Sequence, residues 1–155
     1  MEYTDPREAL LGADTPQISE RPSILVIDDE IGPRESLRIL LKDEYSLSLA
    51  QNGNEGISML KSSRFDVVIL DLRMPGKSGL ETLEEIRKFD RDIPVIILTG
   101  FGTLESAQKA VHLNIFEFVS KPFDVNEIKD IVKRAVEKNR ISRLTYDILR
   151  KLQKL

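Results

Sequence analysis

Short apolar runs recur along the chain and are separated by segments in which apolar residues follow a helical period. Three runs are continuous, rich in β-branched residues and followed directly by an acidic or hydroxyl side chain: Ile24–Ile27, Val67–Leu70 and Val95–Leu98. Such runs are typical of strands that are covered on both faces, as in a parallel sheet. Two weaker stretches, Leu47–Leu49 and Phe116–Val119, favour two more strands, the first at an edge of the sheet.

The segments between these strands carry apolar residues three and four positions apart, which indicates helices. The predicted helices are Pro33–Lys42, Asn54–Ser62, Leu80–Lys88, Thr103–Leu113 and Asp124–Asn139. Asp124 and Glu127 have the spacing of a capping box at the start of the last one. Connections this short favour right-handed crossovers. The sequence therefore predicts an α/β fold of the flavodoxin-like (βα)5 type: a doubly wound sheet of five parallel strands with an extended C-terminal helix.

Pattern and composition divide the 155 residues into three segments. Residues 1–22 contain three prolines and no sustained periodicity, so we expect a flexible leader with at most a short helix around Pro6–Leu11. Residues 23–139 contain the strands and helices of the predicted α/β domain. Residues 140–155 form a basic, amphipathic segment without Pro or Gly.

Composition narrows the chemistry and the compartment. The chain has no Cys, which excludes a disulfide framework, a thiolate zinc site and a Cys nucleophile, and its single His cannot form a multi-histidine metal site. A net charge of −3 argues against nucleic-acid binding by the chain as a whole. No apolar run reaches the roughly 18 residues of a membrane-spanning helix, and the N-terminus lacks the apolar core of a secretory signal. We therefore expect a cytoplasmic protein with neither a membrane nor a nucleic acid as partner.

Polar side chains follow four of the predicted strands, at the edge where such sheets bind ligands. They are Asp28 and Asp29 after the first strand, Asp71 after the third, Thr99 after the fourth and Lys121 after the fifth. Three carboxylates in one crevice repel one another, and a hard divalent cation such as Mg²⁺ relieves that repulsion. A carboxylate can then act as a nucleophile toward phosphorus while Lys and Thr hold the phosphoryl oxygens. Each residue alone is more often a cap, a strand residue or a surface group, so the prediction depends on their convergence.

The stretches that carry these residues resemble the signature motifs of bacterial response-regulator receiver domains. They are Ile24–Glu30, Asp71–Gly76, Val95–Gly100 and Phe118–Phe123. The resemblance covers about residues 23–139, with the motifs in the family's order and spacing.

The resemblance implies the roles of the acidic residues. Asp71 would accept a phosphoryl group from a histidine kinase or a phosphotransfer protein of a two-component system. Mg²⁺ would be bound directly by Asp29 and Asp71 and through water by Asp28. The backbone carbonyl of Arg73, two residues past the acceptor, would complete the protein ligands.

The resemblance also implies a switch. Lys121 would pair with the phosphoryl oxygens, Thr99 would move to contact them, and Phe118 matches the aromatic residue that responds. The Lys121–Pro122 peptide is expected to be cis. Asn114 stands where many relatives have Gly at the end of a helix, and Asn tolerates the left-handed conformation that this position needs.

Two rival functions can be compared with this assignment. A hydrolase of the haloacid-dehalogenase type would need a second Asp two residues after the nucleophile, where this chain has Arg73. A pseudo-receiver, an interaction module without phosphorylation, would be expected to lack one of the acids, the Thr or the Lys, and all of them are present.

Phe101, two residues past Thr99, is bulky and is expected to shield the phosphoryl group from water.

The last segment predicts a continuation of the final helix. Four of its apolar residues are three, four and seven positions apart, as on one face of a helix: Ile141, Leu144, Ile148 and Leu155. Leu149 and Leu152 make this apolar face wider. The helix either folds back on its own domain or forms a coiled-coil linker, and we expect the linker and a homodimer. No output module follows it, so we expect a fragment of a larger regulator rather than one that acts through this domain alone.

Bases are concentrated in the same segment and would repel one another across a tight helix pair. We therefore expect them on the outer faces of the pair, or beside acids of the second copy such as Glu137 and Asp147. These bases are Arg140, Arg143, Arg150, Lys151 and Lys154.

Overall fold

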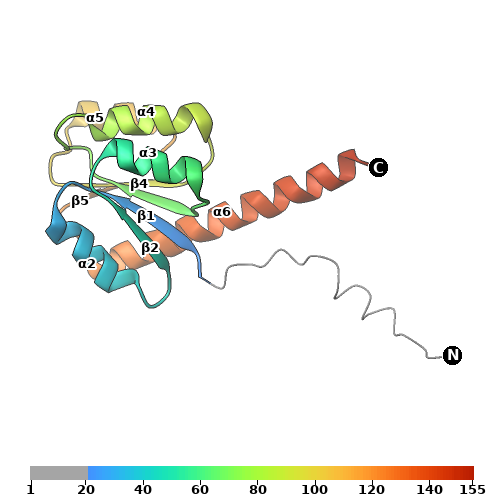
Figure 1. Ribbon diagram of the computed structural model, residues 1–155, viewed down its shortest axis with the longest axis horizontal. Helices are drawn as coiled ribbons and strands as arrows, with labels where there is room; N and C mark the ends of the chain where they lie inside the picture. Colours follow the sequence, from blue (N-terminus) through green and yellow to red (C-terminus); the bar gives the residue numbers. More distant parts are fainter. Residues whose placement is uncertain (1–20) are drawn as a thin grey trace.

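The computed structural model describes residues 21–155. The predicted leader, residues 1–22, lies outside the described residues except for its last two, as does the short helix expected around Pro6–Leu11. Strands and helices alternate through the described part (Figure 1). In chain order they are β1 (Ser23–Ile27), α2 (Ile31–Leu41), β2 (Ser46–Ala50), α3 (Gly53–Ser62), β3 (Val67–Leu70), α4 (Gly79–Phe89), β4 (Val95–Thr99), α5 (Leu104–His112), β5 (Glu117–Ser120) and α6 (Val125–Gln153).

The strands form one parallel sheet in the order β2-β1-β3-β4-β5. Helices α3, α4 and α5 cover one face of the sheet, and α2 and α6 cover the other (Figure 1). The predicted doubly wound, flavodoxin-like fold with an extended C-terminal helix is confirmed.

Alternate side chains of the central strands enter two separate apolar cores, which is why these strands are apolar throughout. In β1, Ile24 and Val26 belong to the core beneath α2 and α6. Leu25 and Ile27 belong to the core beneath α3, α4 and α5. The predicted edge strand, β2, has a neighbour on one side only and is mostly half-buried.

Polar caps fix where most of the helices begin. Four helices start after a side chain that accepts a hydrogen bond from the backbone N–H three residues further on: Asn52 for α3, Ser78 for α4, Thr103 for α5 and Asp124 for α6. The cap predicted at Asp124 is confirmed. Thr103, predicted as the first residue of its helix, is instead the cap, and it forms a reciprocal capping box with Ser106.

Helix α2 begins at Ile31, two residues before the predicted start at Pro33. The first four N–H groups of a helix have no intrahelical partner. Proline therefore fits anywhere in the first turn, and its presence did not define the first residue.

Helix α6 is one continuous helix of 29 residues that runs past the end of the sheet (Figure 1). Its buried face ends at Asn139, and the apolar stripe of residues 140–155 is exposed, with Ile141 at 66% and Ile148 at 49% of their full accessibility. The stripe therefore does not fold back on its own domain. Within the described part of the chain, no helix has the length and apolar character needed to cross a membrane.

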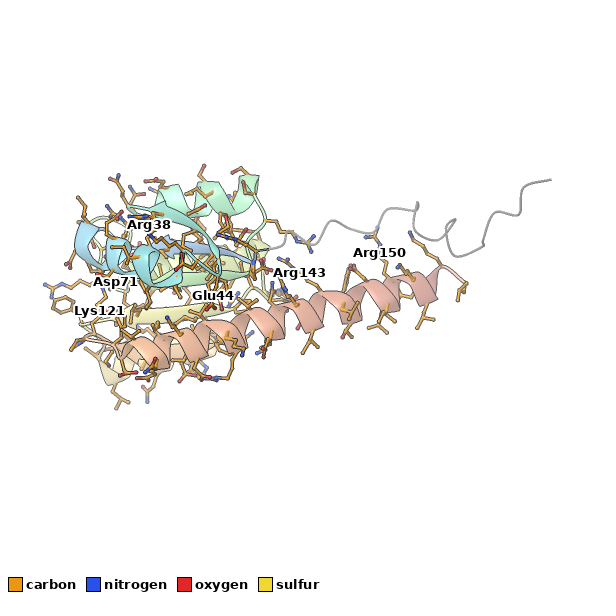
Figure 2. All side chains as sticks on the ribbon, turned by 90° about the horizontal axis from the view of Figure 1, so that it is seen from below. Arg38, Glu44, Asp71, Lys121, Arg143 and Arg150 are labelled. Carbon is orange, nitrogen blue, oxygen red and sulfur yellow. The ribbon has the colours of Figure 1, made fainter. Side chains whose placement is uncertain are left out.

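Arg143 pairs with an acid of its own chain, which differs from the predicted pairing with an acid of a second copy. This side chain lies on the side of α6 that faces the domain (Figure 2), and its Nη1 is 3.1 Å from Oδ1 of Asp66 in the same chain. Helical spacing explains the difference, because Arg143 follows Val136 and Asn139 by seven and four residues and continues their buried face. The other bases of this segment are exposed.

Candidate functional site

The register of the sheet brings the predicted carboxylates together. Ile27 pairs with Leu70, and the N–H of Asp71 donates to the carbonyl oxygen of Ile27 at 3.0 Å. Asp28 and Asp71, which end neighbouring strands, therefore lie side by side. One carboxylate oxygen from each of Asp28, Asp29 and Asp71 lies within 4.8 Å of the others.

Asp71 accepts the most hydrogen bonds of the three carboxylates. It is only 3% exposed, and its two oxygens have different partners. Oδ1 accepts from the Thr99 hydroxyl at 2.8 Å and from the Arg73 backbone N–H at 3.1 Å, whereas Oδ2 accepts from Lys121 Nζ at 2.9 Å. Figure 2 shows Asp71 and Lys121 at one end of the domain, far from the end of α6 that carries Arg150. The expected convergence of Asp71, Thr99 and Lys121 is thus present.

Lys121 also bonds Asp28, so one ammonium group serves two buried carboxylates. Its Nζ lies 2.8 Å from Oδ2 of Asp28, and the Glu30 backbone N–H donates to Oδ1 of Asp28 at 3.0 Å. Burial raises the pKa of the Asp28 carboxyl more than these donors lower it. Burial also lowers the pKa of Lys121, but its bonds to Asp28 and Asp71 outweigh this and hold the pKa above its ordinary value. Lys121 is therefore a cation at neutral pH.

Asp29 provides the observation that favours a cation. It is more exposed than Asp28 and Asp71, yet its Oδ1 is buried and accepts no hydrogen bond from the residues that the structure describes. A buried carboxylate oxygen without a donor is costly, and three carboxylates outnumber the single ammonium group of Lys121. All three offer the oxygen ligands that Mg²⁺ prefers, so the residues fit a hard divalent cation.

Close backbone packing holds the loop that carries Asp71 against the start of α4. A Cβ atom on Gly79, the first residue of α4, would lie 2.2 Å from the carbonyl oxygen of Asp71 and 2.4 Å from Cα of Leu72. The N–H of Gly79 donates to the carbonyl oxygen of Leu72 at 2.8 Å. Only glycine lets α4 begin this close to the loop that carries Asp71.

Arg73 and Phe101 contact each other beside the three carboxylates, and the sequence analysis did not predict this contact. The Arg73 guanidinium carbon lies 4.1 Å from the centre of the Phe101 ring, a cation–π contact. Both residues line a cleft of about 370 Å³ that also contains Asp29 and Pro75. The Phe101 ring is 56% exposed, and its backbone N–H donates to the Thr99 hydroxyl at 3.3 Å. The expected position of Phe101 beside the site is therefore present, with Arg73 stacked on it.

Arg34 is a second residue that the sequence analysis missed. It is 8% exposed, and its Nη1 donates to the backbone carbonyl of Asp28 at 2.6 Å. A signal was present in the sequence, because Arg34 lies three and seven residues before Leu37 and Leu41 on the apolar face of α2. A base at such a position needs a buried acceptor, and the end of β1 supplies one.

The predicted switch residues, Thr99 and Phe118, both lie close to Gly102 in the loop that follows β4. Thr99 is buried, and Phe118 is half-buried against the core beneath α3, α4 and α5. A Cβ atom on Gly102 would lie 2.6 Å from Cζ of Phe118, so the ring closes against this loop. Asn114 has the predicted positive φ, at 58°, and the Lys121–Pro122 peptide is cis, as predicted.

The family model of the response regulator receiver domain matches residues 24–133. The chain is 37% identical over 112 residues to sporulation initiation phosphotransferase F of Bacillus subtilis, which covers 72% of this chain and 90% of that protein. It is 33% identical over 124 residues to the transcriptional regulatory protein ZraR of Klebsiella oxytoca, which covers 79% of this chain but 28% of that protein.

Solved structures give the same result. The response regulator protein TrrA of Thermotoga maritima, solved in complex with Mg²⁺ and BeF, is 40% identical with a TM-score of 0.67 over 74% of this chain and 98% of that one. A response regulator receiver domain from Clostridium thermocellum is 33% identical with a TM-score of 0.73 over 77% of this chain and 98% of that one.

Proposed function

The chain belongs to the family of response regulator receiver domains, and from this we propose that it is the phosphorylation-controlled switch of a two-component system. Asp71 accepts a phosphoryl group from a sensor histidine kinase or a phosphotransfer protein, and the resulting change controls an output domain or partner. The observation that carries the proposal is the setting of Asp71: a buried carboxylate with one oxygen bonded to Thr99 and the other to Lys121.

The chemistry follows from these bonds. A carboxylate oxygen of Asp71 forms a bond to phosphorus as the bond from phosphorus to the donor nitrogen breaks, and the electron pair of that bond stays with the donor imidazole. Lys121 keeps a positive charge beside the phosphoryl oxygens throughout. Loss of the group to water reverses the modification. The catalysis proposed is limited to these two steps on the protein's own side chain.

Mg²⁺ is the proposed cofactor. Asp29 and Asp71 would bind it directly, Asp28 through water, and the backbone carbonyl of Arg73 would complete the protein ligands. Bound Mg²⁺ would neutralise charge on the transferring phosphoryl group. The uncompensated oxygen of Asp29 supports this assignment, and so does the Mg²⁺ named in the TrrA complex.

The switch residues are proposed to be Thr99 and Phe118. The Thr99 hydroxyl donates to Asp71 before transfer, and a phosphoryl group on Asp71 offers it new acceptors that draw it inward. This movement would vacate space beneath the loop that contains Gly102, against which the Phe118 ring is packed. Rotation of Phe118 would then alter the surface made by α5 and β5.

A homodimer through α6 is proposed from the exposed stripe beyond Asn139. Ile141, Ile148 and Leu155 are seven residues apart and therefore follow one face of the helix, and Leu144 lies between them. Each is at least 49% exposed. Pairing with a second copy would remove this apolar surface from water, which contributes roughly 25 cal/mol per Å² buried.

We also propose the division into residues 1–22, 23–139 and 140–155, a cytoplasmic location and no nucleic-acid partner for this segment. The output activity of a relative such as ZraR belongs to that protein, of which the match covers 28%.

Asp71→Asn should abolish phosphorylation by acetyl phosphate in the presence of Mg²⁺. The amide is not a nucleophile toward phosphorus, and no other carboxylate bonds both Thr99 and Lys121 in the part of the chain that the structure describes. Intact-mass spectrometry measures the acid-labile mass gain, with exposed Asp92→Asn as a control that should be labelled like the parent. Full labelling of the Asp71 variant would rule out this acceptor.

Asp29→Ala should weaken Mg²⁺ binding by at least about tenfold, because a proposed direct ligand is lost. Mg²⁺ should raise the melting temperature of the parent, since a ligand specific for the folded state at 100 times its Kd contributes about 2.7 kcal/mol. Melting curves across a Mg²⁺ titration compare the parent, Asp29→Ala and the exposed-site control Asp43→Ala. The ligand assignment is wrong if Asp29→Ala and the parent shift alike.

Thr99→Ala should accept the phosphoryl group but respond weakly, because the hydroxyl that senses it is missing. Thr99→Ser keeps that hydroxyl and should respond like the parent. Amide NMR shifts over α5 and β5, recorded with and without phosphorylation, measure the response, and the coupling lost should be about 1–3 kcal/mol. A parent-like response in Thr99→Ala would exclude this route.

The double substitution Ile141→Ser and Ile148→Ser should convert a dimer into a monomer at about 50 µM, a range in which weak pairs are populated. Tyr146→Ser removes an exposed aromatic residue from another face of α6 and should leave the dimer intact. Sedimentation velocity measures all three proteins. If the parent is already a monomer, the proposed pairing is overturned while the phosphorylation proposal stands.

A further inference from the structure

One carboxylate, Asp66, bonds three segments at the amino ends of the strands, opposite the proposed phosphorylation site at their carboxyl ends. It directly precedes β3, and its Oδ2 accepts from the N–H of Ser23, the first residue of β1, at 2.9 Å. Its Oδ1 accepts from Asn139 Nδ2 at 3.3 Å and from Arg143 Nη1 at 3.1 Å. Arg143 Nη2 donates to the carbonyl oxygen of Phe65 at 2.8 Å. We call these five residues the Asp66 clasp.

The clasp holds α6 where the helix leaves the domain. The last side chain of the helix in the apolar core is Val136, and Asn139 is the last buried residue. Beyond it Arg143 is half-buried, whereas every residue from Leu144 to Leu155 is exposed. Among the described residues, the bonds of Arg143 are thus the last hydrogen bonds from α6 to the domain before the helix runs past it (Figure 2).

The clasp uses polar groups where packing alone would favour apolar ones. Asn139 is 6% exposed and continues a helix face otherwise formed by Ile, Val and Ala. A buried amide is costly unless it is hydrogen-bonded, and Asp66 supplies the bond. Burial lowers the pKa of the Arg143 guanidinium, and the nearby charge of Arg64 lowers it further, while Asp66 acts in the opposite direction. These hydrogen bonds form only when Asn139 and Arg143 face Asp66, whereas apolar contacts have no such directional requirement.

The fork of Arg143 sets direction as well as distance. One nitrogen bonds the carboxylate of Asp66 and the other the backbone of Phe65, so the planar guanidinium is fixed at two points. Phe65 and Asp66 are the two residues before β3, and Asp71 directly follows that strand. Arg143 therefore fixes the direction in which α6 leaves the domain relative to β3, the strand that directly precedes the proposed phosphoacceptor.

We propose that the Asp66 clasp is a positioning device that joins the exposed part of α6 to the domain as one rigid body, and that Arg143 is its principal residue. Without it, no side-chain hydrogen bond that the structure describes would join α6 beyond Asn139 to the domain. The proposal does not depend on the identity of the phosphoacceptor or on a second copy of the chain, and its test reads helix direction only.

The test measures how narrowly the end of α6 is placed. The chain has no Cys, so Lys88→Cys on α4 and Gln153→Cys at the end of α6 give two exposed labelling sites in the full chain. Pulsed electron–electron resonance on spin-labelled protein, diluted with unlabelled protein to suppress distances between copies, gives the distance distribution. We expect one narrow peak with the clasp intact and a distribution about twofold broader in Arg143→Gln.

Two further variants separate position from charge and from folding. Arg140→Gln removes the same charge from an exposed site less than one turn away and should leave the peak narrow. Asp66→Asn should broaden the distance distribution as Arg143→Gln does, and a melting curve checks that this variant is folded. If Asp66→Asn is not folded, Arg143→Gln gives the decisive result, because Arg143 is the more exposed of the two residues. An unchanged width in Arg143→Gln, or equal broadening in Arg140→Gln, would overturn the proposal.

Discussion

The structure depends on the bond of one ammonium group to two buried carboxylates. Asp28 and Asp71 end adjacent strands, and without Lys121 their charges would face each other in a site from which water is largely removed. Lys121 reaches them from the far side of β4, so this interaction ties the ends of β1 and β3 to the turn after β5. Asp124, the cap of α6, follows three residues later, and the same interaction therefore places both the site and the origin of the longest helix.

One ammonium group compensates only part of the negative charge at this edge. Burial raises the pKa of the Asp28 carboxyl, and the buried Oδ1 of Asp29 accepts no hydrogen bond from the described residues. Functional sites commonly keep such groups at a cost in stability, because a fully compensated site has nothing left with which to bind a cation or to attack an electrophile. The folded chain therefore holds its acidic edge in a state that a cation would relieve.

How much of this could be read from the sequence depends on whether a contact has a periodic or positional signature. Strands buried on both faces appear as continuous apolar runs, and the ends of parallel strands meet at one edge, so the cluster of Asp28, Asp71 and Lys121 was predictable. Helix ends were less so, because Pro33 fits anywhere in a first turn.

The contacts that were missed are single polar pairs between distant segments. None of these contacts belongs to a repeating pattern in the sequence. They are the contacts of Arg143 with Asp66, of Arg73 with Phe101 and of Arg34 with the carbonyl of Asp28. Arg34 and Arg143 had a visible signal, because each is a base that lies on the buried face of its helix, but neither pattern names the acceptor. The stacking of Arg73 depends on how two loops approach each other, which no spacing in either loop reveals.

The length of α6 has a mechanical consequence. The part beyond Asn139 extends for about 21 Å at 1.5 Å per residue, and it touches the domain only near its base. It is a lever arm: a tilt of about 10° where it leaves the sheet displaces its far end by about 4 Å. A rearrangement too small to disturb the packing of the sheet can thus become, at the tip of the helix, a displacement as large as the diameter of a side chain.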